Sequence, residues 1–186
     1  MIRNPALVLA ALLAPGVAAA AEVGPVQIDK SRVSFVSKQM GVPIDGEFRK
    51  FAAQLGFDPA KPESGRAQID IDMASIDAGS AEANEEVVGK NWFNVQQFPK
   101  AAFVSTSVKP LGGGKFEVAG KLTIRDKTRE VVLPFTMTPQ GATVHFDGSF
   151  LIKRADFGIG QGVWADFDTV ANEVQIKFKV VAAAKK

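Results

Sequence analysis

The sequence predicts an all-β protein, and three observations lead to that prediction. Apolar and polar residues alternate with a period of two in several stretches, as in "NEVQIKFKVV" from 172 to 181. Successive side chains of a strand point to opposite faces, so this alternation indicates strands with one apolar face. Turn-forming residues separate the stretches, and only one segment has a helical pattern. Several short strands separated by turns favour a sandwich or an antiparallel barrel over alternating strands and helices.

The expected elements follow in order along the chain. Clear alternation marks residues 31–38, 66–73, 115–125, 143–152 and 172–181, whereas 101–109 and 130–138 are rich in β-forming residues but have less clearly divided faces. Turn signals lie at "PLGGGK" (110–115), "RDKT" (125–128) and "TPQGA" (138–142), and such Gly-rich and polar stretches connect hairpins. Between about 75 and 98 the pattern predicts one short helix with a further turn near 91–95.

The apolar faces leave the nature of the interior open. A sandwich leaves little room between its sheets, whereas a barrel of about eight strands either fills its lumen or holds one small ligand. Gly120 and Gly148 lie on apolar faces, and an inward residue without a side chain leaves space or allows a sharp bend. These glycines favour the roomier barrel, with barrel curvature alone as the alternative explanation.

Composition excludes several classes of function. Lys and Arg number 22 and Asp and Glu number 20, and this near-balance argues against a nucleic-acid-binding protein. The chain has no Cys, which excludes a disulfide framework, a thiolate nucleophile and a Cys-based zinc site. Its one His, His145, excludes a cluster of several histidines around a metal ion.

Residues 1–21 have the pattern of a secretory signal peptide. Arg3 precedes an apolar run, Pro15 and Gly16 interrupt it, and small residues follow up to Ala21. The run is too short to span a bilayer comfortably; a retained anchor or an apolar N-terminal helix is the alternative. We therefore expect a mature domain of residues 22–186 that is exported, in a bacterium, to the periplasm.

Several further stretches match one known family in their order and spacing. They are "SRVSFVSKQMG" (31–41), "GEFRKF" (46–51), "ASIDAG" (74–79), "NWFNVQQFPKAAFVST" (91–106), "VAGKLTIRDKTREVVLPF" (118–135) and "KRADFGIG" (153–160). Over residues 26–181 the chain thereby resembles the YceI-like proteins, which are secreted or periplasmic lipocalin-like barrels associated with polyisoprenoid binding. Asp126 and Lys153 depart from the family pattern, which often has Gly and Asn there.

The resemblance implies an eight-stranded antiparallel lipocalin-like barrel with a short helical insertion. It also implies a cavity for a long isoprenoid tail, with the head of an isoprenoid quinone or a polyprenyl pyrophosphate near the mouth. The protein would carry this lipid through the periplasm without covalent chemistry and without a cofactor. No nucleic-acid partner is expected, whereas transient contact with a membrane and a homodimer both remain open.

Inward apolar side chains are sufficient to line a cavity for a tail that has no hydrogen-bonding groups. Core packing is the alternative for each of them, because both roles use the same face. Arg154 is expected near the head group because a guanidinium offers a fork of N–H donors, with pairing to Asp156 or exposure to solvent as the alternative. The candidate ligand-binding residues are Phe35, Phe48, Ile69, Ile71, Phe103, Phe116, Val118, Leu122, Phe150, Ile152, Arg154, Trp164, Val174, Ile176 and Phe178.

The segments 80–98 and 158–167 are expected to form the lid or rim of this cavity, with Trp164 at its entrance.

Two other classes of function are the alternatives to lipid carriage. A hydrolase-like enzyme needs a desolvated acid–base pair, but Asp70 and Asp72 alternate with isoleucines and so face solvent; we therefore predict no enzyme, no catalytic residue and no metal site. The other alternative is a barrel with a fully packed interior that binds other proteins.

Overall fold

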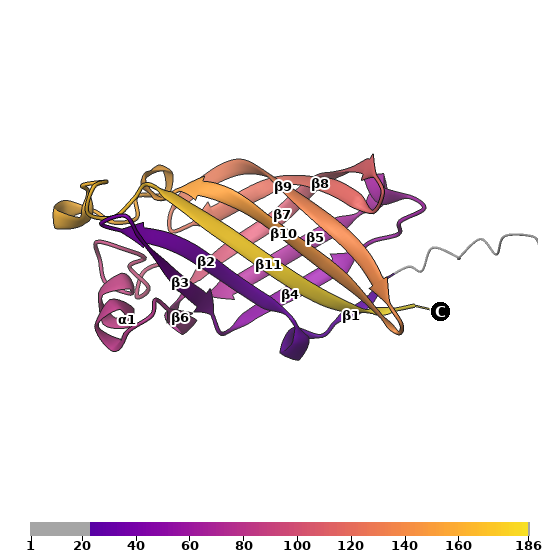
Figure 1. The fold of residues 1–186 in the computed structure, drawn as a ribbon, viewed down its shortest axis with the longest axis horizontal. Helices are drawn as coiled ribbons and strands as arrows, with labels where there is room; N and C mark the ends of the chain where they lie inside the picture. The colour runs from indigo at the N-terminus through magenta and orange to yellow at the C-terminus, as the bar shows by residue number, and fades with distance from the viewer. Residues whose placement is uncertain (1–22, 186) are drawn as a thin grey trace, which may run out of the picture.

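The computed structural model describes residues 23–185, in which one large antiparallel sheet curls into a barrel (Figure 1). The strand order is β4-β5-β7-β8-β9-β10-β11-β2-β3-β6, and β1 pairs with β11. The strands are β1 (Val23–Val26), β2 (Arg32–Gln39), β3 (Val42–Phe48), β4 (Phe51–Gly56), β5 (Arg66–Asp72), β6 (Ile76–Asp77), β7 (Lys100–Gly112), β8 (Lys115–Ile124), β9 (Lys127–Gln140), β10 (Thr143–Lys153) and β11 (Glu173–Ala184). The helix is α1 (Ala81–Val87), and short 3₁₀ helices occupy Ile28–Lys30, Pro62–Ser64, Met73–Ser75, Arg154–Phe157 and Gly162–Trp164.

The predicted fold class is confirmed, but the predicted number of strands is wrong. The sheet has eleven strands rather than eight. β1 and β6 are four and two residues long, too short for a periodic pattern. β3 contains Pro43 and Gly46, which are unusual inside strands, and β4 contains small residues on both faces. The contrast between the two faces of β3 and β4 is therefore weak in the sequence.

The barrel closes without a continuous ladder of hydrogen bonds. β3 and β4 are consecutive in the chain, but β3 pairs with β2 and β4 pairs with β5. The chain after β5 crosses the gap between them, because β6 pairs with the end of β3. The Arg49 amide donates to the Ser75 carbonyl at 3.1 Å, and the Asp72 amide donates to the Lys50 carbonyl at 3.0 Å. These contacts join the two ends of the sheet.

Phenylalanine rings fill one end of the barrel. Phe57 packs against Phe116, Phe135 and Phe146, with centroids 5.2, 6.1 and 5.7 Å apart and nearly perpendicular rings. Phe116 and Phe135 also stack, at 5.2 Å. Edge-to-face and offset arrangements are the favourable ones for aromatic pairs. This aromatic cluster closes the lumen at the end where the β7–β8 hairpin lies, opposite α1 (Figure 1).

The opposite end carries the non-strand segments of the chain. Helix α1 and the turns of residues 88–99 lie on one side of this end, and the connection 154–172 between β10 and β11 lies on the other (Figure 1). Ser80 caps the start of helix α1, since its Oγ accepts a hydrogen bond from the Ala83 amide at 3.2 Å. The predicted short helical insertion is thus confirmed, and it lies at the end of the barrel away from the β7–β8 hairpin (Figure 1).

We expect Phe57→Ala to lower the free energy of unfolding by about 3–5 kcal/mol, because it removes a buried ring and leaves a void among its neighbours. Val132→Ala is the matched control: Val132 is 55% exposed on β9, and its truncation should change stability by less than about 0.5 kcal/mol. Urea unfolding followed by circular dichroism measures both variants. A loss no greater than that of the control would contradict a packed aromatic end.

Candidate ligand cavity

A cavity of about 590 Å³ occupies the rest of the lumen. Pockets for small molecules typically measure about 300–1,000 Å³. Inward apolar side chains make up most of the lining, which reaches the exposed residues Gln39, Glu82 and Glu86 at the α1 end. The cavity therefore opens to solvent at that end, whereas the aromatic cluster around Phe57 closes the other. Arg66, which pairs with Gly56 at the start of β5 and so lies near Phe57, is a further exposed lining residue at the edge of the aromatic end.

Glycines in the wall explain why the lumen stays hollow, although not in the way that the sequence suggested. Gly46 lies opposite Phe35 on the neighbouring strand, and Gly148 lies opposite Phe178. A Cβ atom at either glycine would collide with the facing phenyl ring, and a Cβ at Gly120 would lie 2.5 Å from the ring of Phe103. The space at Gly120 and Gly148 is thus occupied by rings that lie against the wall, and the lumen remains free because they do so.

The structure places every candidate residue except Phe116 on the cavity lining. Phe116 faces inward but lies in the aromatic cluster, stacked on Phe135, so we no longer expect it to contact a ligand. Contact between a ligand and the remaining residues stays a prediction. The candidates on the lining are Phe35, Phe48, Ile69, Ile71, Phe103, Val118, Leu122, Phe150, Ile152, Arg154, Trp164, Val174, Ile176 and Phe178.

Exposure to the cavity decreases along the inward face of a single strand. On β11, Ile176 and Phe178 face inward yet remain partly exposed, whereas Val180 on the same face is 2% exposed. β11 pairs with β10 on one edge and β2 on the other, so the remaining exposure of Ile176 and Phe178 is to the cavity. The inward face of β11 is therefore open to the cavity at Ile176 and Phe178 and almost fully covered at Val180, which still borders the cavity.

Sequence reasoning missed several lining residues, among them Phe57, Trp92 and Phe93. Phe57 continues the alternation of Phe51, Ala53 and Leu55 along β4, and that alternation was the available signal. Trp92 and Phe93 belong to the turns after α1, where no periodic pattern exists. Their position depends on the backbone hydrogen bonds of residues 87–98, such as that from the Phe93 amide to the Val87 carbonyl at 3.0 Å.

Arg154 lies at the mouth, but it binds the protein's own backbone. Its side chain is 2% exposed, so the alternative of solvent exposure is wrong, and its hydrogen bonds go to carbonyls rather than to Asp156. All five N–H groups of an Arg side chain find acceptors here. The acceptors are the carbonyls of Ala171 (3.2 Å), Ile159 (2.9 Å), Gly160 (2.9 Å), Trp164 (2.7 Å) and Val170 (2.8 Å).

These contacts give Arg154 an organising role in the connection 154–172. The guanidinium also lies over the rings of Trp92 and Phe167, at 5.8 and 5.2 Å from their centroids. Burial lowers the pKa of Arg154, because desolvation disfavours the charged form. One buried cation thereby fixes the shape of the loop that borders the cavity mouth.

A hydrogen bond crosses the mouth between the two sets of loops. The Trp164 indole Nε1–H donates to Oε1 of Glu86 on α1 at 2.7 Å, and its ring lies 5.6 Å from that of Trp92. The Gln161 amide donates to the Asn91 carbonyl at 2.8 Å. Both predicted lid segments therefore meet at the mouth, and Glu86 and Trp164 join them directly.

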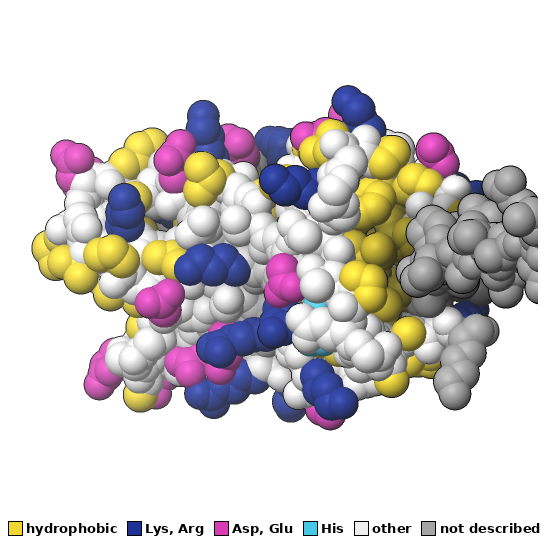
Figure 2. Space-filling view, turned by 45° about the vertical axis from the view of Figure 1, so that its right-hand side comes forward, with side chains coloured by type: hydrophobic (Ala, Val, Ile, Leu, Met, Phe, Trp, Pro, Cys, Tyr) yellow, Lys and Arg dark blue, Asp and Glu magenta, His cyan; other side chains and the backbone are white. Residues whose placement is uncertain are grey.

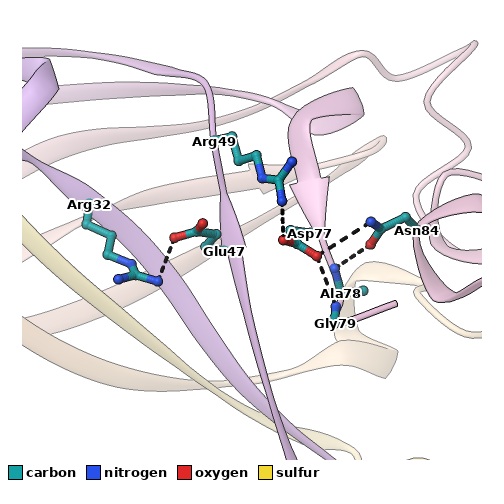
Figure 3. Close-up of polar contacts among 7 residues, drawn as sticks. All are labelled: Arg32, Glu47, Arg49, Asp77, Ala78, Gly79 and Asn84. Atoms are coloured by element: carbon teal, nitrogen blue, oxygen red, sulfur yellow. Dashed lines mark hydrogen bonds and ion pairs between the residues drawn. The ribbon is translucent and has the colours of Figure 1, made fainter. Parts of the chain in front are cut away.

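Asp77 anchors the start of α1 to the barrel (Figure 3). Its carboxylate accepts hydrogen bonds from Arg49 at 2.5 Å and from the Gly79 amide at 3.1 Å. Asn84 of α1 donates to the same carboxylate at 3.5 Å and accepts from the Ala78 amide at 2.6 Å. The Gly79 amide, and next the Arg49 guanidinium, lower the pKa of Asp77. Figure 3 also shows the neighbouring ion pair of Arg32 with Glu47.

The acidic pair that could have suggested catalysis lies outside the cavity lining. Asp70 accepts a hydrogen bond from the Gln68 side chain at 3.0 Å, and Asp72 accepts one from the Ala74 amide at 3.0 Å. Within residues 23–185, no group of three His, Cys, Asp or Glu side chains is arranged to hold a metal ion. The same part of the chain contains no helix whose length and hydropathy would allow it to cross a membrane.

The lowered pKa of Asp77 predicts a defined pH dependence. The contribution of this carboxylate to stability is present above its ordinary pKa of 3.8 and is lost as the pH falls through the lower pKa of the folded state. Asp77→Asn should therefore lower Tm at neutral pH, and the difference from the unchanged protein should shrink below about pH 4. Thermal unfolding between about pH 2.5 and 7 measures this; a Tm difference independent of pH would refute the assignment.

Comparison with known proteins agrees with this architecture. Residues 25–182 match the family described as the YceI-like domain. A protein named UPF0312 from Azotobacter vinelandii is 31% identical over 181 residues, which is 91% of each chain. The crystal structure of BcnA from Burkholderia cenocepacia is 52% identical, has a TM-score of 0.82 and covers 84% of this chain and 99% of its own.

A more distant structure shares the fold. It is described as a polyisoprenoid binding domain from Saccharophagus degradans implicated in plant cell wall breakdown; it is 17% identical, with a TM-score of 0.66, and covers 89% of this chain and 98% of its own. The resemblance predicted from the sequence motifs is confirmed by the match over nearly all of the described residues. This chain belongs to the YceI-like family.

Proposed function

We propose that the protein is a periplasmic carrier that holds a long isoprenoid lipid in its barrel and performs no covalent chemistry on it. The observation that carries the proposal is the apolar cavity of about 590 Å³ with its opening at the α1 end. The description of the Saccharophagus degradans domain as polyisoprenoid-binding supports the same ligand class. The predicted signal peptide, residues 1–21, lies outside the described residues, and the periplasmic location remains part of the proposal.

The energetics of tail binding favour a hydrocarbon ligand. Each buried methylene contributes about 0.8 kcal/mol, and a ligand of some forty atoms at about 0.3 kcal/mol per atom gains roughly 12 kcal/mol. A tail without donors or acceptors leaves no polar group of its own unsatisfied in this lining. The hollow lumen also argues against the alternative of a barrel packed solid with its own side chains.

The polar groups at the mouth support a neutral quinone head over a pyrophosphate. The N–H groups of Arg154 are already donated to backbone carbonyls, so they are not free for phosphate oxygens. Glu82 and Glu86 contribute carboxylates to the same part of the lining, and these repel a pyrophosphate. Gln39 and Ser37 offer neutral hydrogen-bonding groups instead.

Native mass spectrometry tests the ligand directly. Protein purified without detergent from its host should carry an adduct with the mass of an isoprenoid quinone, and the added quinone should compete successfully with a polyprenyl pyrophosphate. Val174→Phe should at least roughly halve the adduct, since Val174 lines the cavity beside Ile152 and the added ring projects into the void. Val132→Phe on the outer face of β9 is the matched control. Failure of every isoprenoid to bind, in purified and reconstituted samples alike, would end the proposal.

Release of the ligand should depend on the contact between Trp164 and Glu86. Trp164→Ala removes a hydrogen bond and an aromatic pair, and we expect about tenfold faster lipid release. Glu86→Gln keeps an acceptor oxygen for the indole and should release lipid at nearly the original rate. Stopped-flow transfer of a fluorescent prenyl lipid to acceptor vesicles measures the rates. Unchanged release from Trp164→Ala would count against a closed mouth.

A further inference from the structure

Exposed apolar side chains project from the loops around the cavity mouth. Val163 is 81% exposed, Met40 73%, Val42 59% and Phe167 49%. We call these residues the apolar rim. Met40 and Val42 belong to the β2–β3 hairpin, and Val163 and Phe167 belong to the connection 154–172. Apolar side chains are visible at the corresponding left-hand end of the molecule in Figure 2.

Hydrogen bonds hold the two parts of the apolar rim together. The Met40 amide donates to the Thr169 carbonyl at 2.9 Å, and the Ala171 amide donates to the Lys38 carbonyl at 2.9 Å. Val163 directly precedes Trp164, which lines the cavity and contacts α1. The apolar rim is therefore a connected structure that borders the opening of the barrel.

Met40 has an unfavourable backbone conformation as well as an exposed side chain. Its φ is 48° and that of Gly41 is 79°, so both central residues of this tight turn are left-handed. Hairpins with that geometry strongly prefer Asn-Gly, because Asn tolerates the left-handed region better than Met. Folding and solubility would both favour Asn over Met here. A residue that breaks two local rules without a gain in packing indicates a functional requirement.

A lipid bilayer fits the apolar rim better than a protein partner does. The apolar side chains stand on separate loop tips, and Asp166 and Asp168 lie between Val163 and the end of the connection. A stable protein interface buries roughly 800 Å² per partner on complementary surfaces, whereas the interfacial region of a bilayer accepts separate apolar tips. The charges near the tips are of both signs, with Lys38 on β2 and Asp166 and Asp168 in the connection 154–172, so apolar insertion rather than attraction to anionic lipids is the expected driving force.

We propose that the apolar rim inserts into the interface of a lipid bilayer and so places the mouth of the cavity against the membrane. The purpose of this docking rests on the proposed function, since a water-insoluble tail is exchanged most directly where the cavity meets the lipid. The docking itself is independent of any bound isoprenoid, and the two ideas can therefore fail separately.

Co-sedimentation with phosphatidylcholine vesicles that contain no isoprenoid tests the proposal. The rim variant combines Met40→Asn with Val163→Asp; Asn suits the left-handed turn, so folding should be preserved. The matched control combines Val132→Asn with Leu151→Asp, two residues of the outer strand faces that are 55% and 60% exposed. The unchanged protein and its variants are prepared without the predicted signal peptide, as residues 22–186. The unchanged protein should partition into vesicles, the control within about twofold of it, and the rim variant at least about tenfold more weakly.

Salt provides a second measurement. Partitioning should change little between roughly 50 and 500 mM NaCl, because apolar insertion is not screened. Equal partitioning of the rim variant and the control overturns the proposal, as does failure of the unchanged protein without residues 1–21 to bind vesicles. If the rim variant lost binding to native membranes, which contain proteins, but not to lipid vesicles, the apolar rim would be assigned to a protein partner instead. Native mass spectra of the same variants should retain the isoprenoid adduct, and this control separates a loss of membrane docking from a loss of ligand binding.

Discussion

A phenyl ring lying across a glycine of the neighbouring strand is the contact on which the hollow interior depends. Strand alternation directs bulky apolar side chains inward, and in a small barrel such side chains usually fill the lumen. Here Phe35 and Phe178 lie over Gly46 and Gly148, and Phe103 lies over Gly120. The rings cover the wall instead of crossing the lumen. Glycine is the only residue that leaves room for these rings. The size of the cavity therefore depends on three glycines that are not among its lining residues.

Strongly alternating strands could be predicted from the sequence, and weakly alternating ones could not. β5, β8, β10 and β11 direct alternate apolar side chains toward the cavity, so the alternation records their orientation directly. β3 and β4 form the gap in the barrel, where pairing is incomplete and Pro43, Gly46 and small residues suit the local geometry. The sequence therefore described the regular wall and missed the place where the sheet joins its own end.

The inward face was predictable for the site, whereas depth along the barrel and the course of the loops were not. Phe116 and Phe178 have the same alternation, yet one stacks in the aromatic cluster and the other lines the cavity. The position of a residue along the barrel depends on strand stagger, which no single strand encodes. Trp92, Glu86 and Arg154 come together through loop contacts between distant parts of the chain, and the pairing of one guanidinium with five carbonyls leaves no recognisable motif.

The choice of carbonyls as partners for Arg154 affects how the loop responds to its surroundings. Carboxylates become protonated at low pH, and exposed ion pairs weaken at high salt concentration. Carbonyl dipoles do neither, and this guanidinium is shielded from mobile ions by its burial. The connection 154–172 is therefore fixed by hydrogen bonds from Arg154 to backbone carbonyls, and these acceptors do not titrate. That side of the entrance therefore keeps its form when the acidity or salinity of the surrounding fluid changes, whereas the α1 side depends on the carboxylate of Asp77.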